Sequence, residues 1–264
     1  MLDTKALQEY LCLHDYALVI DGIFGPATLK ALQTFEADYG LPPTAHAAHE
    51  VVSPLTAAYL RRPITEATRS KHEVPVWGLS GRRDVWREAL LWIAWRQLHW
   101  QAREVGRQNC GPWVRAYMDG RDGKPFAWCA GFVETCMRMA LQEFDRTIPA
   151  SSEVAALVVS EDAKERWWWT VSGWARKAEE QERLLKTPEA VRRGDLFLVR
   201  KKGGEGYSHI GIVASAPDVG FSSARPPFLT LEGNSNEAGA YEGVKVVKRT
   251  RTAYGKHFIS LVEV

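Results

Sequence analysis

The sequence predicts an α+β chain in which helices come first and a small antiparallel sheet follows. Apolar residues recur at helical spacing in the first part of the chain, for example from Val85 to about Val105. After Gly194 the spacing changes to two, and short apolar runs alternate with glycine-containing turns. Helices followed by strands, rather than alternating with them, favour an α+β architecture over a parallel sheet.

The composition is that of a globular protein with a substantial core. Of 264 residues, 45% are hydrophobic and 25% are charged, and the net charge of +2 is too small to favour nucleic acid as a partner. No run approaches the roughly 18 apolar residues of a membrane span. The first residues also lack the basic and apolar regions of a signal peptide. We therefore expect a monomer that is made in the cytoplasm, does not insert into membranes and is released by another route.

The cysteines and acidic residues do not predict a metal site. The four cysteines form no C-x-x-C pair, so neither a zinc site nor a disulfide framework is expected. Asp119 and Asp122 lie in a glycine-containing turn, but Ca²⁺ needs six or more oxygen ligands. No metal and no cofactor are predicted.

Residues 1–62 are predicted to form a small domain of three helices. Asp3 or Thr4 can cap the first helix, Pro26 suits the first turn of the second, and Ser53-Pro54 begins the third. The sequence here resembles the peptidoglycan-binding domain of many cell-wall hydrolases. The residues that carry the resemblance are Leu7-Gln8, Leu11, Asp21-Gly22-x-Phe24-Gly25-Pro26-x-Thr28, Ala31, Phe35 and Gly40-Leu41.

This resemblance implies a module that holds a catalytic domain on the glycan–peptide mesh of bacterial peptidoglycan. The motif residues mostly build the fold rather than a binding site. A helical docking domain without affinity for glycan therefore stays an alternative.

Residues 63–82 contain prolines, glycines and charges without periodicity, and they are predicted to be a linker. The second domain then spans 83–264. Its helical part includes a tryptophan-rich stretch at 151–190. Its strands are expected at 194–199, 208–213, 230–234, 243–251 and 257–264.

Cys129 is the candidate nucleophile of the second domain. Pro125 disfavours helix in the residue before it, so a helix should begin near Trp128 or Cys129. At a helix start, unpaired N–H groups and the dipole favour the thiolate, which is the nucleophilic form. By itself, however, a lone cysteine is more often a buried core residue.

Two later segments support a catalytic role for this cysteine. His209 begins an apolar strand directly after a glycine-rich turn and can act as the base for a thiol. Glu232 and Asn234 lie two residues apart on the next strand, so alternation directs both side chains to one face. Either could orient the imidazole of His209. The alternatives are that His209 is a surface histidine at the end of a strand and that Glu232 and Asn234 belong to a turn.

These segments resemble the CHAP family of cysteine amidases and peptidases, close to the NlpC/P60 group. The matching residues are Trp128-Cys129-Ala130-x-Phe132-Val133, Ser208-His209-Ile210-Gly211-Ile212-Val213, Glu232-Gly233-Asn234 and Gly194-Asp195. The resemblance implies a papain-like fold with the cysteine on a helix and the histidine and its partner on the sheet. It implies cleavage of a peptidoglycan amide, as an N-acetylmuramoyl-L-alanine amidase or an endopeptidase. Trp128 and Asn109 are expected to contribute to substrate binding.

The two resemblances together suit a phage endolysin released by a holin, which acts on the cell wall or in the periplasm. A secreted antibacterial effector would have the same chemistry. A non-catalytic wall-binding protein and a thiol acyltransferase are the alternatives of other classes.

Overall fold

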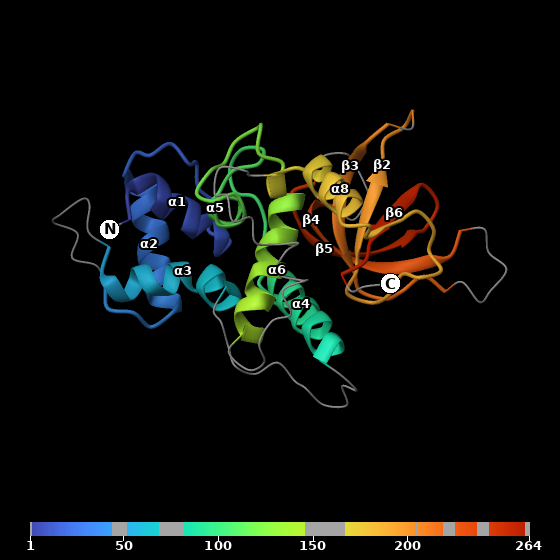
Figure 1. Cartoon of the computed structure of the whole chain (residues 1–264). Helices are drawn as coiled ribbons and strands as arrows, with labels where there is room; N and C mark the ends of the chain where they lie inside the picture. The colour runs from blue at the N-terminus through green and yellow to red at the C-terminus, as the bar shows by residue number, and fades with distance from the viewer. Residues whose placement is uncertain are drawn as a thin grey trace. The chain divides into compact units, whose positions relative to one another are not determined.

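The computed structural model describes residues 2–43, 52–68, 82–145, 167–203, 205–218, 225–236 and 243–261. Figure 1 shows the whole chain. Contacts between its residues divide it into two compact units. Unit 1 contains Met1–Arg69 and Arg103–Phe126, and unit 2 contains Ser70–Ala102 and Ala127–Val264. Among the described residues, no helix is both long and apolar enough to cross a lipid bilayer.

Unit 1 is helical. Its helices are α1 (Thr4–Leu13), α2 (Pro26–Asp38), α3 (Pro54–Thr68) and α5 (Pro112–Tyr117). The side chain of Asp3 caps α1 by accepting the N–H of Ala6 at 2.7 Å. The core between α1, α2 and α3 consists of buried apolar side chains at helical spacing, namely Leu2, Leu7, Leu11, Leu32, Phe35, Leu41 and Leu60.

Gln8 fixes the turn between α1 and α2. Its amide nitrogen donates to Asp21 Oδ1 at 2.8 Å and to Thr28 Oγ1 at 3.1 Å, and its oxygen accepts the N–H of Gly22 at 2.8 Å. Gly22 has a φ of 77°, a conformation that glycine adopts without strain. The residues of this motif that carry the resemblance are therefore explained by the turn that they form.

The first residues of the predicted linker 63–82 are helical. Helix α3 continues through Pro63 to Thr68, and residues 69–81 lie outside the described residues. A proline inside a helix cannot donate to the carbonyl four residues earlier, here Tyr59. His14 compensates at this turn, because its Nε2 lies 3.0 Å from the carbonyl oxygen of Leu60 and it also bonds to the Tyr59 backbone.

Residues 103–126 pack with unit 1, although the sequence placed them in the domain 83–264. Arg103 bonds to the carbonyl of Leu13 at 3.0 Å and to Asp15 Oδ1 at 2.6 Å. Arg115 pairs with Glu9 of α1 and with Asp122 Oδ2, the latter at 2.5 Å. These charged contacts join the segment to α1. Whether the functional domains follow the boundaries 1–62, 63–82 and 83–264 stays a prediction.

The pairing of Arg115 with Glu9 should stabilise unit 1. The Glu9 side chain is only 4% exposed, so Arg115→Met would leave a buried carboxylate without its cation. We expect the variant to lose about 3 kcal/mol of unfolding free energy, the lower end for a broken buried pair because Arg115 is partly exposed. Hydrogen exchange of the amides of α1 measures this loss.

Arg176→Met is the control, because Arg176 and Glu180 form an exposed pair on a helix of unit 2. It should change stability by no more than about 0.5 kcal/mol. Equal α1 protection in wild type and Arg115→Met would contradict a stabilising role for the Arg115–Glu9 pair.

The helices of unit 2 are α4 (Arg82–His99), α6 (Cys129–Asp145), the 3₁₀ helix η1 (Trp167–Trp169) and α8 (Val171–Glu180). Helix α4 ends at His99, earlier than the predicted Val105, because Gln101 has a left-handed φ of 51°. Helix α6 packs against α4, and it also packs against the sheet at strands β3 and β4 (Figure 1). Of the predicted tryptophan-rich helical stretch, residues 151–166 lie outside the described residues.

Six antiparallel strands form one sheet in the order β1-β6-β2-β3-β4-β5. The strands are β1 (Leu184–Leu185), β2 (Leu196–Arg200), β3 (Tyr207–Val213), β4 (Pro227–Ser235), β5 (Lys245–Thr252) and β6 (Lys256–Ile259). All five predicted strands are present, with ends within three residues of those expected, except that β6 ends at Ile259, five residues before the predicted end, and residues 262–264 lie outside the described residues. The short strand β1 was not predicted, because two residues give no alternation to detect. The α+β class is therefore confirmed, whereas the papain-like assignment stays a prediction.

Candidate active site

Cys129 is the first residue of α6, within the range predicted from Pro125, and it is 5% exposed. Its thiol is hydrogen-bonded to the side chain of His209 and to the backbone of Ile210 and Ala130. Burial by itself raises the pKa of this thiol, but the charge and hydrogen bonds around it outweigh burial and lower the pKa. The helix start adds unpaired N–H groups and the positive end of the dipole. The surroundings of Cys129 therefore favour the thiolate form.

The three other cysteines are in the opposite situation. Burial raises the pKa of Cys12, Cys110 and Cys136, and no histidine or arginine contact reverses the effect. A protonated thiol is a poor nucleophile. Cys129 is thus the only one of the four whose surroundings favour the reactive form.

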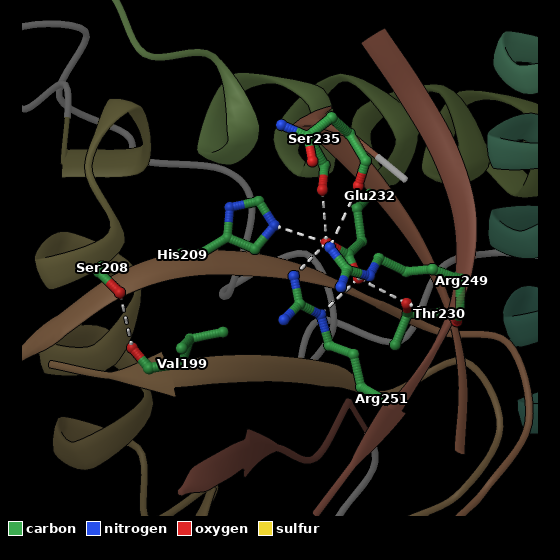
Figure 2. Close-up of polar contacts among 9 residues, drawn as sticks. Val199, Ser208, His209, Thr230, Glu232, Ser235, Arg249 and Arg251 are labelled. Carbon is green, nitrogen blue, oxygen red and sulfur yellow. Dashed lines mark hydrogen bonds and ion pairs between the residues drawn. The ribbon is translucent and has the colours of Figure 1, made fainter. Parts of the chain in front are cut away.

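His209 lies on β3 between the thiol and a carboxylate. Its Nε2 is 2.9 Å from Oε2 of Glu232 (Figure 2), so the hydrogen bond with Cys129 belongs to Nδ1. Burial lowers the pKa of His209, but the hydrogen bonds and charges of Cys129 and Glu232 raise it to about 9. A lowered thiol pKa beside a raised imidazole pKa favours the ion pair of thiolate and imidazolium over the neutral pair.

The sheet brings His209 and Glu232 together. Strand β3 pairs with β4 so that Ile212 faces Leu231 and Val213 faces Thr230. Counting along this register by alternation places His209 and Glu232 on the same face of neighbouring strands. Their contact follows from strand pairing between positions 23 residues apart, which only the folded sheet creates.

Glu232 is completely buried and accepts several hydrogen bonds (Figure 2). Arg251 binds both of its oxygens, from Nε to Oε1 at 2.5 Å and from Nη2 to Oε2 at 2.6 Å. Thr230 donates to Oε1 at 2.6 Å and Ser235 to Oε2 at 3.0 Å. Burial raises the pKa of Glu232, but the bonds from Arg251 and His209 outweigh it and hold the pKa far below its usual range. The carboxylate is ionised and fixed in orientation.

No hydrogen bond described for Asn234 joins it to His209, although the sequence predicted that it shares a face with Glu232. The β4–β5 register shifts between Glu232 and Ser235, and Asn234 has a left-handed φ of 50°. Such a bulge breaks alternation and turns the side chain elsewhere. With its amide oriented to satisfy both neighbours, Asn234 accepts the N–H of Trp128 at 3.1 Å and donates to the carbonyl of Gly243. It therefore holds the residue before the thiol.

The structure does not support a substrate contact by the side chains of Trp128 or Asn109. The indole of Trp128 is fully buried, and a Cβ added to Gly233 would lie 3.0 Å from its Cζ3. Asn109 belongs to unit 1, is 4% exposed and donates from Nδ2 to the carbonyl of Lys124 at 3.1 Å. Both side chains are occupied in packing and in a loop.

Sequence reasoning missed the groups that hold Glu232, namely Arg251, Thr230 and Ser235. A signal was available, because Arg249 and Arg251 lie two apart on one predicted strand and Thr230 and Glu232 on another. Alternation puts each pair on one face. Nothing in the sequence, however, shows that the two strands are neighbours with these faces in common.

No group of three or more histidine, cysteine, aspartate or glutamate side chains in the described part of the chain is placed to hold a metal ion. In the turn considered for calcium, Asp122 Oδ2 accepts hydrogen bonds from Arg115 and from the N–H of Gly111. This carboxylate takes part in the packing of unit 1.

Comparison with known families identifies the N-terminal module. Residues 2–47 match the family described as "Putative peptidoglycan binding domain". This stretch includes α1, α2 and the turn held by Gln8, and the match supports a wall-binding module at the N-terminus. No curated protein and no solved structure matches the chain. Cys129, His209 and Glu232 lie outside the matched residues.

Proposed function

We propose that this protein is a thiol-dependent peptidoglycan hydrolase that cleaves an amide bond of the wall peptide. The observation that carries the proposal is the hydrogen-bonded series Cys129–His209–Glu232, in which the thiol has a lowered pKa and begins a helix. A nucleophile, a base and a group that orients the base are the parts that covalent amide hydrolysis requires. The N-terminal match supplies the substrate class.

In the proposed mechanism the Cys129 thiolate attacks the carbonyl carbon of the amide and forms a tetrahedral oxyanion. The backbone N–H of Cys129, at the start of α6, is a candidate donor to this oxyanion. The His209 imidazolium donates its proton to the leaving amine, and the C–N bond breaks to give a thioester. Neutral His209 then takes a proton from water, which attacks the thioester and releases a carboxylate and the thiolate.

Glu232 keeps its charge throughout this cycle. Its negative charge stabilises the imidazolium, and its contact with Nε2 leaves Nδ1 directed to the sulfur. Unit 1 would increase the local concentration of wall substrate without changing the chemistry. The site of action in this proposal is the bacterial wall, reached by phage-type lysis or by export as an effector.

Digestion of purified sacculi tests the proposal. We expect products with new amino groups and no new reducing sugars, because an amide rather than a glycosidic bond is cut. Mass spectrometry of the products then identifies the bond, either muramoyl–L-alanine or a bond within the stem peptide. Binding to sacculi without any release of soluble fragments would instead support a non-catalytic wall-binding protein. Release of reducing sugars alone would contradict amide cleavage.

A further inference from the structure

We propose that Arg251 is a positioning residue, which holds Glu232 against His209 and thereby sets the pH range in which Cys129 is reactive. The inference deepens the proposed function and rests on it for its biological meaning. The thiol reactivity that tests it does not require hydrolysis.

The geometry of the Arg251–Glu232 contact is that of a bidentate fork. Nε and Nη2 of Arg251 each bind one carboxylate oxygen, at 2.5 Å and 2.6 Å. Oε2 is the oxygen that also faces His209 at 2.9 Å (Figure 2). A planar guanidinium bound through two nitrogens fixes the plane of the carboxylate, which a single contact would not do. Arg251 thus determines which oxygen reaches the imidazole.

Arg251 is itself held in place. Its guanidinium carbon lies 5.3 Å from the ring centroid of Phe197, a buried residue of β2. The ring of Phe197 is also 6.1 Å from the ring of His209. The arginine side chain is 17% exposed and the carboxylate is not exposed at all. The fork is therefore a partly buried support for Glu232, and its arginine packs on a buried ring.

The surrounding charges explain why such a support is needed. Glu232 faces His209 of β3, Arg249 and Arg251 of β5 and, at longer range, Lys256 of β6. Beyond His209 lies Cys129 of α6. A buried carboxylate without a bound cation tends to take up a proton. A protonated Glu232 would stabilise the imidazolium poorly, and the thiolate would lose its partner.

Arg251 has a second electrostatic effect of opposite sign. Its positive charge also disfavours a proton on nearby His209, so its removal could by itself make the imidazolium more stable. The two effects predict opposite shifts in the pH at which the Cys129 thiolate forms, so measuring this pH in an Arg251 variant tests the proposal. If positioning dominates, loss of Arg251 weakens the imidazolium and the thiolate forms only at higher pH.

The experiment measures the rate of iodoacetamide alkylation of Cys129 as a function of pH in the full chain, with the labelled peptide resolved by mass spectrometry. For Arg251→Met we expect the midpoint of the curve to move up by about one pH unit or more, so that the rate at pH 6 falls about tenfold. Arg251→Lys keeps the charge but not the fork, and it should give an intermediate shift. Because Arg251→Lys is the milder change, it also covers the case in which Arg251→Met does not fold.

Arg249→Gln is the matched control, because its Nε is 4.0 Å from the same carboxylate and beyond hydrogen-bond distance. It removes one positive charge from the same face and should shift the midpoint less than half as far. In a Glu232→Gln background, Arg251→Met should add no further upward shift, since its effect passes through Glu232.

A downward shift in Arg251→Met, or an equal shift with and without Glu232, would overturn the proposal. Equal shifts in Arg249→Gln and Arg251→Met would do the same, because they would indicate only a charge effect. If wild type fails to hydrolyse peptidoglycan while the expected shifts are found, the proposed function is wrong and the positioning role stands.

Discussion

Replacing Cys129 by alanine should abolish release of soluble peptides from sacculi, with a loss of at least about 10³-fold. The thiolate forms the covalent bond to substrate in the proposed mechanism, and no other group can take over that step. The residue is at the start of α6, so the smaller side chain should leave the fold and the wall binding of unit 1 unchanged. A turbidity assay on sacculi, with a separate pull-down assay for binding, measures both properties.

Cys110→Ser is the matched control for this experiment. Cys110 is a partly exposed free thiol whose pKa is raised by burial. We expect the variant to keep nearly full activity. Iodoacetamide at pH 6 should label Cys129 first, because its pKa is lowered. Preferential labelling of Cys110 with a parallel loss of activity would show that the nucleophile has been misassigned.

Replacing Glu232 by glutamine should have the second largest effect, a loss of about 10²-fold in kcat, typical of impaired general acid–base catalysis. The amide can still meet the imidazole, but it carries no charge to stabilise the imidazolium. The pKa of His209 is raised from 6.5 to about 9 in the wild type, so the imidazolium persists through neutral pH and is lost as the pH rises through about 9. In the wild type, kcat should fall on this alkaline side of its pH profile. In the variant, this alkaline limb of the profile should move to lower pH.

The raised pKa of His209 also makes the stability of the fold depend on pH. Because the folded pKa of His209 is raised, its contribution to stability is fully present below pH 6.5 and is lost as the pH rises through about 9. Glu232→Gln should reduce this pH dependence. The variant should also be less stable overall, since Arg251 loses its bound carboxylate. Unfolding measured between pH 6 and pH 9 separates the two contributions.

Asn234→Ala distinguishes the two residues that the sequence placed together. Asn234 contacts the N–H of Trp128 and not the imidazole, so its loss should slow the reaction by only about tenfold, or about 1.4 kcal/mol of barrier. The alkaline limb of the pH profile should stay in place. An inactive Asn234→Ala enzyme beside a Glu232→Gln enzyme of near wild-type rate would reverse the assignment.

The N-terminal helices and the strands of the sheet could be predicted from the sequence because their signals are local. Caps, glycines at positive φ and apolar spacing act over a few residues, as at Asp3, Gly22 and Pro26. The same holds for the start of α6 at Cys129, which follows from Pro125. The contacts of 103–126 with unit 1 could not be read from local signals, since they include the bond between Arg115 and Glu9, which are 106 residues apart.

The sequence by itself determined the α+β class and the peptidoglycan-binding motif, and it predicted the residues of a thiol site, with Glu232 and Asn234 on one face of a strand and Glu232 only modestly ahead as the partner of His209. Only the tertiary structure distinguished between those two. A register shift in β4 turns Asn234 toward the backbone of Trp128, while Glu232 stays on the face of His209. The fork of Arg251 likewise depends on β5 lying beside β4. Strand order and bulges arise from long-range pairing, which alternation along a single strand does not encode.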